Sequence, residues 1–122
     1  MNKGTALVID DEAQMRKLLE ITLESHDYRV ALAATAREGL AMATMHPPQF
    51  ILLDLGLPDM DGTELAKTLR QRPECSSSLM VAITGYGQNS DRIKSIDAGF
   101  DHHLVKPVDM PRLLKILSET AV

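Results

Sequence analysis

The chain has 122 residues, of which 44% are hydrophobic and 25% charged, and its formal net charge is −4. This length suits one compact domain with a buried core, and the composition is that of a folded globular protein. The negative charge, without any run of basic residues, argues against a nucleic-acid surface, which needs clustered lysine and arginine. We therefore expect a single domain over residues 1–122 that does not bind nucleic acid directly.

Cysteine content and hydropathy indicate the cellular compartment of the protein. Cys75 has no partner for an internal disulfide, and the first five residues, MNKGT, lack the apolar region of a signal peptide. No apolar run approaches the roughly 18 residues that cross a bilayer. We expect a cytoplasmic domain without membrane contact of its own, although its parent protein could be membrane-bound.

Short apolar segments alternate with segments of helical periodicity. In chain order they are a strand at 6–10, a helix at about 12–25, a strand at 28–34, a helix from about 36 to before Pro47, a strand at 50–54, a helix at 62–71, a strand at 79–84, a helix at about 88–98, a strand at 103–106 and a helix from 109. In the first helix, Met15, Leu19 and Leu23 recur every four residues and form an apolar stripe. Thr35 is the expected N-cap of the second helix.

This alternation predicts an α/β fold with a parallel sheet and helices on both faces. The strands at 6–10 and 50–54 are continuously apolar, which is typical of central strands that are covered on both sides. Right-handed crossovers leave a few doubly wound strand orders. Among them we predict the flavodoxin-like order 2-1-3-4-5 in a three-layer α/β/α arrangement with five strands.

Polar residues that can carry chemistry fall at the carboxyl ends of four predicted strands. They are Asp10 and Asp11, Asp54, Thr84 and Lys106. In an open α/β sheet the ligand crevice lies outside these ends, where the strand order reverses, here between the first and third strands. We therefore expect three carboxylates, a hydroxyl and an ammonium group to gather at one site.

Three carboxylates in one crevice need a counter-charge, and Lys106 alone would leave them net negative. A divalent cation would supply it, and oxygen ligands without histidine or cysteine favour Mg²⁺. A phosphoryl group would use both the cation and the lysine, which would explain a costly carboxylate such as Asp54 at the end of a buried strand. Each residue alone also has a structural explanation, since Asp11 is an equally good N-cap for the next helix. The joint arrangement favours the functional interpretation.

The motifs around these residues resemble the receiver domain of two-component response regulators, and the resemblance spans residues 5–120. VIDDE at 8–12 resembles the acidic pair of that family, and LLDLGLPDMDG at 52–62 resembles its phosphoacceptor motif. AITGYG at 82–87 supplies the threonine, and AGFDHHLVKP at 98–107 supplies the lysine that follows the fifth strand.

The resemblance implies a signalling phosphoacceptor rather than a turnover enzyme. Asp54 would accept a phosphoryl group from a phosphohistidine on a histidine kinase or phosphotransfer protein, in a Mg²⁺-dependent reaction. Asp11, Asp54 and the backbone carbonyl of Gly56 would coordinate the ion, and Asp10 would hold it through water. Phosphoryl transfer depends mostly on positioning and charge neutralisation, which agrees with this set of residues.

The resemblance also implies a switch. Lys106 would pair with one phosphoryl oxygen and Thr84 would move to bond another, which changes the face made by the fourth helix, fifth strand and fifth helix for an unknown downstream protein. His103 stands at the switch position where the family usually has tyrosine or phenylalanine. Two interpretations stay open: His103 is a surface residue without a switching role, or it moves inward as a neutral imidazole. In the second case the switch would depend on pH, because a protonated imidazole resists burial. Gly56 and Tyr86 fall where the family tunes loss of the phosphoryl group, and the peptide bond after Lys106 is expected to be cis.

Two other functions stay open. A Mg²⁺-dependent phosphohydrolase also forms an aspartyl-phosphate, but usually has a second aspartate two residues after a nucleophile on the first strand, whereas Asp10 and Asp11 are adjacent. A receiver-like scaffold that is never phosphorylated predicts loss of a key residue, and all five are present. The parent protein is open too, because the chain could stand alone or belong to a hybrid sensor histidine kinase. The segments TGYGQ and AGFDHHLVKPVD resemble the receivers at the C-termini of such kinases.

Overall fold

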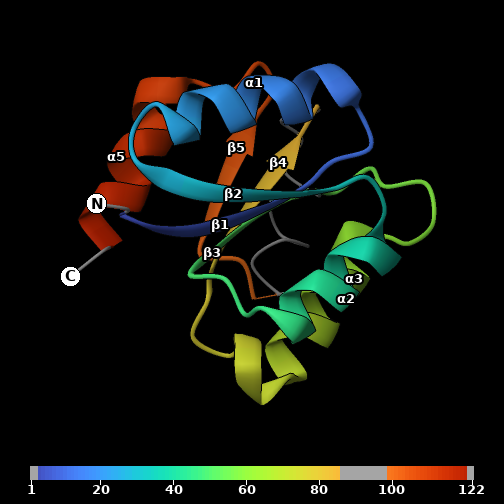
Figure 1. The fold of residues 1–122 in the computed structure, drawn as a ribbon. Coiled ribbons are helices and arrows are strands. Elements are labelled where there is room, and N and C mark those ends of the chain that lie inside the picture. Colours follow the sequence, from blue (N-terminus) through green and yellow to red (C-terminus); the bar gives the residue numbers. More distant parts are fainter. Residues whose placement is uncertain (1–2, 86–98, 121–122) are drawn as a thin grey trace.

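The computed structural model describes residues 3–85 and 99–120. Within these residues the order of elements is β1 (Gly4–Ile9), α1 (Ala13–Glu24), β2 (Tyr28–Ala33), α2 (Ala36–Met45), β3 (Phe50–Asp54), α3 (Gly62–Gln71), a 3₁₀ turn η1 (Pro73–Cys75), β4 (Leu79–Thr84), β5 (His102–Val105) and α5 (Met110–Thr120) (Figure 1). The helix predicted over 88–98 lies outside the described residues. No helix in the described part of the chain has the length and apolar character needed to cross a membrane.

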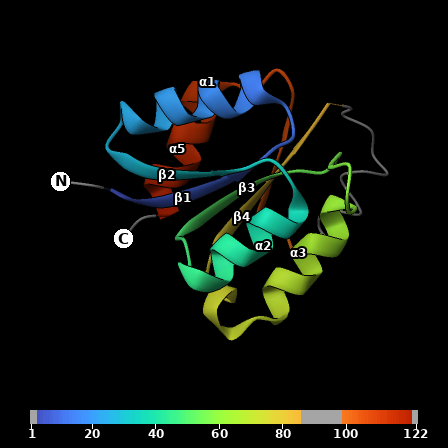
Figure 2. The same ribbon diagram turned by 45° about the vertical axis from the view of Figure 1, so that its right-hand side comes forward.

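The strands form one parallel sheet in the order β2-β1-β3-β4-β5, which confirms the predicted doubly wound fold. Helices α1 and α5 cover one face of the sheet, and α2 and α3 cover the other (Figure 2). This is the expected three-layer α/β/α arrangement. The order reverses between the neighbouring strands β1 and β3, so their carboxyl ends flank the position where ligands bind in such sheets.

Three strands end one residue before their predicted bounds at this edge, and β2 does so at Ala33. β1 ends at Ile9 and β5 at Val105, one residue before the aspartate and the lysine that were assigned to them. Backbone pairing nevertheless continues past both ends, because Asp10 N donates to Ala33 O at 3.0 Å and Lys106 N donates to Thr84 O at 2.7 Å. The polar residues are therefore held by the sheet although they lie outside the strands.

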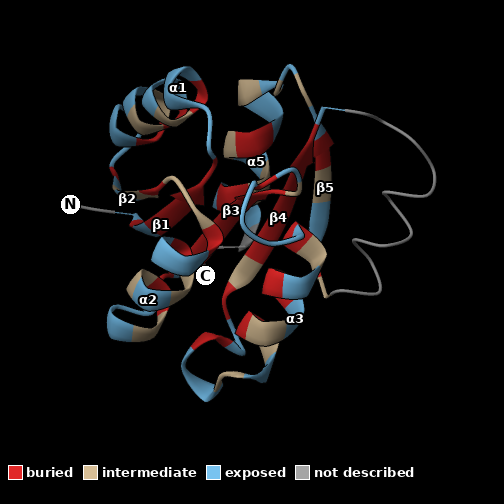
Figure 3. Cartoon of the chain, turned by 90° about the vertical axis from the view of Figure 1, so that its right-hand side faces the viewer, coloured by how far each residue is buried: buried red, intermediate tan, exposed pale blue. Residues whose placement is uncertain are grey.

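The sheet divides the core into two apolar layers. The first packs strand residues such as Ile9 and Leu53 against α2 and α3, and the second packs Val8 and Leu52 against α1 and α5. All residues of β3 are buried, as Figure 3 shows for the centre of the sheet. Burial of one large aliphatic side chain contributes about 2 kcal/mol. The apolar core therefore fixes the strand that ends in Asp54.

Candidate functional site

The structure brings the three predicted carboxylates together at the carboxyl edge of the sheet. One ligand oxygen from each of Asp10, Asp11 and Asp54 lies within 4.8 Å of the other two. Asp10 and Asp54 are buried, with 1% and 7% of their surface exposed, while Asp11 is exposed. Two members of the cluster are therefore buried, and the cluster is open to solvent on the side of Asp11.

Asp10 is only half satisfied by the protein. Its Oδ1 accepts a hydrogen bond from Glu12 N at 2.9 Å. Its Oδ2 is buried and has no hydrogen-bond donor among the described residues. Burial raises the pKa of Asp10, and the charge of Asp54 adds to this, although the Glu12 N–H and Lys106 oppose it. A buried carboxylate oxygen without a donor is costly, and it leaves a position suited to a cation.

Asp54 and Asp10 share a single lysine. Lys106 Nζ lies 3.4 Å from Oδ2 of each carboxylate, which is longer than the 2.7–2.9 Å of strong charge-assisted hydrogen bonds. Burial alone would lower the pKa of Lys106, but Asp10 and Asp54 together outweigh it and raise the pKa. The lysine is therefore charged at neutral pH. One ammonium against three carboxylates leaves the cluster net negative, as the sequence indicated.

Three of the remaining predicted residues lie in the described part of the chain. Thr84 ends β4 and is buried, and His103 is half-buried on β5, paired in register with Ala82 of β4. Within the described residues 3–85 and 99–120, a Cβ added to Gly56 would meet only Asp54 Oδ1, at 3.6 Å. Tyr86 lies outside the described residues.

The alternative explanation for Asp11 is not supported. The N-cap of α1 is Glu12, and its side chain makes no capping hydrogen bond. The nearby backbone N–H of Glu12 is instead bound by Asp10, so Asp11 does not cap the helix. Its carboxylate is left at the solvent side of the cluster. By contrast, Thr35 accepts from Glu38 N, as predicted for the N-cap of α2.

A short turn carries Asp54 into α3. Gly56 N donates to Asp54 Oδ1 at 3.0 Å, and Gly62 N donates to Leu55 O at 3.2 Å. A side chain at Gly62 would place Cβ 2.6 Å from Leu55 Cα, so only glycine fits where the turn closes. The Lys106–Pro107 peptide bond on the other side of the site is cis, as the resemblance implied.

Two neighbours of the site were not singled out from the sequence. Arg16 of α1 donates from its guanidinium to the Asp10 backbone carbonyl at 2.8 Å. Asp59, in the loop after β3, accepts from Ala36 N at 2.9 Å. The partners are 6 and 23 residues apart, and neither spacing has a sequence signature.

The acidic cluster with one shared lysine lies at the strand-order reversal of a doubly wound sheet, and its oxygen ligands are those that a divalent cation prefers. The model of the response regulator receiver domain family matches residues 6–118. The chain therefore belongs to this family. Receiver domains accept phosphoryl groups from histidine kinases and are generally not turnover enzymes, so the predicted signalling class is confirmed.

Three similar proteins illustrate the match. A CheY-like receiver domain from Methanospirillum hungatei JF-1 is 34% identical with a TM-score of 0.87, over 96% of this chain and 92% of that one. The receiver of sensor histidine kinase PA1611 from Pseudomonas aeruginosa PAO1, solved with a magnesium ion in its active site cleft, is 27% identical with a TM-score of 0.88 and 95% coverage of both chains. The KDP operon transcriptional regulatory protein KdpE of Escherichia coli is 38% identical over 107 residues, which are 88% of this chain and 46% of that protein. The chain thus spans about half the length of this curated relative.

Proposed function

We propose that residues 1–122 form one receiver unit in which Asp54 accepts the phosphoryl group from a histidine kinase or a phosphotransfer protein. The observation that carries this proposal is the environment of the Asp54 carboxylate. Its Oδ1 is held by Gly56 N, whereas its Oδ2 has, among the described residues, only the long 3.4 Å contact to Lys106 Nζ. One oxygen is therefore fixed and the other is free to act as the nucleophile.

The transfer is a displacement at phosphorus. The Oδ2 of Asp54 forms a bond to phosphorus while the bond to the donor's imidazole nitrogen breaks, and that nitrogen keeps the electron pair and takes up a proton. Lys106 would then pair with one phosphoryl oxygen, and the Thr84 hydroxyl would donate to another. Both residues neutralise negative charge on the transferred group, which is the main requirement of this chemistry.

The carboxylates of Asp10, Asp11 and Asp54 fit Mg²⁺. They are hard oxygen donors, their ligand atoms lie within 4.8 Å of one another, and the buried Oδ2 of Asp10 has no hydrogen-bond donor in the described chain. Asp11, Asp54 and the Gly56 carbonyl would bind the ion directly and Asp10 through water. When bound, the ion supplies positive charge against the carboxylates and the phosphoryl oxygens. The magnesium ion in the PA1611 receiver supports this assignment.

The switch and its output follow from the same family membership. Thr84 and His103 would carry the change to the face made by β5, α5 and the helix predicted from the sequence at 88–98, which would then bind a downstream protein. Gly56 and Tyr86 would tune how fast the phosphoryl group is lost. The composition favours a protein partner over direct nucleic-acid contact by this domain, which would work in the cytoplasm.

The parent protein is a separate question. Hybrid histidine kinases and transcriptional regulators both carry receivers, as PA1611 is named a sensor histidine kinase and KdpE a transcriptional regulator. We propose the hybrid kinase because the TGYGQ and AGFDHHLVKPVD segments resemble its C-terminal receivers. In that case the whole protein would be an enzyme although this domain is not.

The proposal is tested by intact-mass spectrometry after incubation with acetyl phosphate. The wild type should gain one phosphoryl group only when Mg²⁺ is present, and Asp54→Asn should gain none. Asp61→Asn is the matched control, since Asp61 lies in the same loop but caps α3 through Thr63 N. This variant should be phosphorylated like the wild type. Equal uptake by Asp54→Asn would contradict the assignment, and no uptake by a folded, Mg²⁺-bound wild type would favour the unphosphorylated scaffold.

A further inference from the structure

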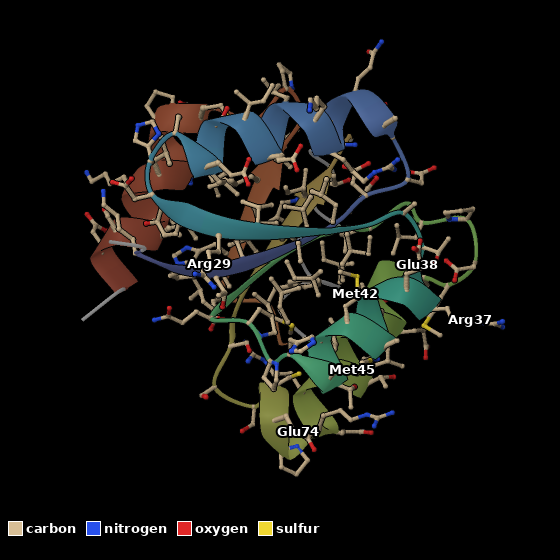
Figure 4. All side chains as sticks on the ribbon, viewed as in Figure 1. Arg29, Arg37, Glu38, Met42, Met45 and Glu74 are labelled. Atoms are coloured by element: carbon tan, nitrogen blue, oxygen red, sulfur yellow. The ribbon has the colours of Figure 1, made fainter. Side chains whose placement is uncertain are left out.

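A carboxylate from the loop after β3 closes the N-terminus of α2. Asp59 Oδ1 accepts from Ala36 N at 2.9 Å, and Asp59 Oδ2 accepts from Arg37 N at 3.1 Å. Figure 4 shows Arg37 and Glu38 at the end of α2 that lies nearest this loop. The contact joins two segments that are more than 20 residues apart in the chain.

Local capping of α2 leaves a place for this carboxylate. The first backbone N–H groups of a helix have no partner within the helix. Thr35 binds one of them, since its Oγ1 accepts from Glu38 N at 3.1 Å. Glu38 Oε1 accepts from Ala34 N, one residue before the N-cap, so it does not complete a capping box. The N–H groups of Ala36 and Arg37, the first two residues of the helix, are the ones that Asp59 binds.

The same carboxylate is close to the phosphoacceptor along the chain. Asp59 is three residues after Gly56, whose N–H holds Oδ1 of Asp54. The loop is also fixed by the buried side chain of Leu57 and by Asp61, which caps α3. Leu57 and Asp61 anchor the loop to the apolar layer and to α3, and Asp59 anchors it to α2.

We infer that Asp59 is a positioning residue for the phosphoacceptor site. It holds the loop of residues 55–61 against α2 and so fixes the backbone of Gly56, which orients Asp54 through its N–H and is a proposed Mg²⁺ ligand through its carbonyl. This inference rests on the proposed function for the role of Gly56 and Asp54. Outer residues that orient metal ligands commonly change metal affinity when they are replaced.

The electrostatics of Asp59 agree with this role. Its hydrogen bond from the Ala36 N–H lowers its pKa most, partial desolvation opposes this, and the N–H and the charge of Arg37 lower the pKa further. The carboxylate is therefore ionised at neutral pH. An anion at a helix N-terminus is favourable because of the partial positive charge there.

The experiment compares Asp59→Ala with Thr35→Ala. Thr35→Ala removes a cap from the same helix without cutting its link to the loop, so it controls for destabilisation of α2. Calorimetric titration with Mg²⁺ should show about tenfold weaker binding for Asp59→Ala and unchanged binding for Thr35→Ala. Asp59→Asn keeps one acceptor oxygen and should fall between wild type and Asp59→Ala.

Hydrogen exchange in the absence of Mg²⁺ gives a second readout. The Gly56 and Leu57 amides should exchange faster in Asp59→Ala than in Thr35→Ala. Equal effects of both variants on exchange and on Mg²⁺ affinity would overturn the inference, since Asp59 would then be only a cap. If wild type takes up no phosphoryl group but these differences persist, the proposed function fails while the positioning role stands.

Discussion

The two edges of the sheet differ in how completely their polar groups are hydrogen-bonded. At the amino edge, Arg70 of α3 donates to Ser78 O at 2.6 Å and to Gly99 O at 3.0 Å. It also pairs with Asp101 Oδ2 at 2.7 Å, and that oxygen accepts from Met80 N at 2.8 Å. This set of residues, the Arg70 clasp, joins α3 to the starts of β4 and β5 with short hydrogen bonds.

The carboxyl edge is less satisfied. Oδ2 of Asp10 has no hydrogen-bond donor in the part of the chain that the structure describes, and Lys106 lies 3.4 Å from both Asp10 and Asp54. A fully paired polar network stabilises a fold, whereas a partly paired one costs stability. The chain therefore has its short, stabilising polar contacts at the amino end of the strands, whereas a bound cation would complete the pairing of the carboxylates at the other end.

The largest effect is expected from breaking the amino edge. Arg70→Ala should lower the free energy of unfolding by about 2–3 kcal/mol, mainly because the carbonyls of Ser78 and Gly99 lose their donor. The ion pair adds little, since the Asp101 side chain is 40% exposed. Urea denaturation measures this effect. Lys67→Ala, at an exposed position of the same helix, should stay within about 0.5 kcal/mol of wild type.

The loss of stability in Arg70→Ala should leave the acidic site intact. Folded Arg70→Ala should bind Mg²⁺ as tightly as wild type, because the clasp lies at the opposite edge. Weaker binding in this variant would show that the two edges are coupled rather than separate.

A smaller effect of opposite sign is expected at the carboxyl edge. Without Mg²⁺, Asp10→Asn should raise the free energy of unfolding by about 1 kcal/mol, because it removes a buried charge but keeps an oxygen for Glu12 N. With Mg²⁺ at ten times its Kd, wild type should gain about 1.4 kcal/mol and the variant less. Thermal unfolding with and without Mg²⁺ measures both values. A variant that is less stable than wild type in the absence of Mg²⁺ would refute the interpretation of Asp10.

The smallest effect is expected for Asp59, whose carboxylate differs from that of Asp10 at the same edge. The pKa of Asp59 is lowered from 3.8, opposite in direction to that of Asp10. Its contribution to stability is therefore present above pH 3.8 and is lost as pH falls through the lower folded value. The difference in Tm between wild type and Asp59→Asn should be constant between about pH 7 and 5, and it should shrink below about pH 4. A difference that persists unchanged at about pH 3 would argue against the ionised cap.

The fold and the acidic cluster could be predicted because their signals are local. Periodicity distinguishes strands from helices, right-handed crossovers restrict the strand order, and parallel strands bring their carboxyl ends to one edge. These rules place Asp10 and Asp54 side by side although 43 residues lie between them in the sequence. The strand ends themselves were misplaced by one residue at Asp10 and Lys106, because pairing continues beyond the regular strand.

The Arg70 clasp and the Asp59 contact could not be predicted in this way. Arg70 and Asp101 are 31 residues apart, and Asp59 and Ala36 are 23 apart, and both pairs depend on the paths of loops rather than on any periodic pattern. The choice between capping and clustering for Asp11 was also beyond the sequence, since both need an aspartate at the same position. The structure distinguishes the two roles, because the Glu12 N–H at the start of α1 is bound by Asp10 and not by Asp11.

The central position of β3 has a consequence for how activity is lost. Regions that open locally are those with few buried contacts, whereas central strands exchange only when the whole domain unfolds. All residues of β3, including Asp54, are buried, and the strand pairs with a neighbour on each side. Asp54, the proposed phosphoacceptor, thus lies on a buried central strand, so its phosphorylation should decline with heat in step with the folded fraction and not before it.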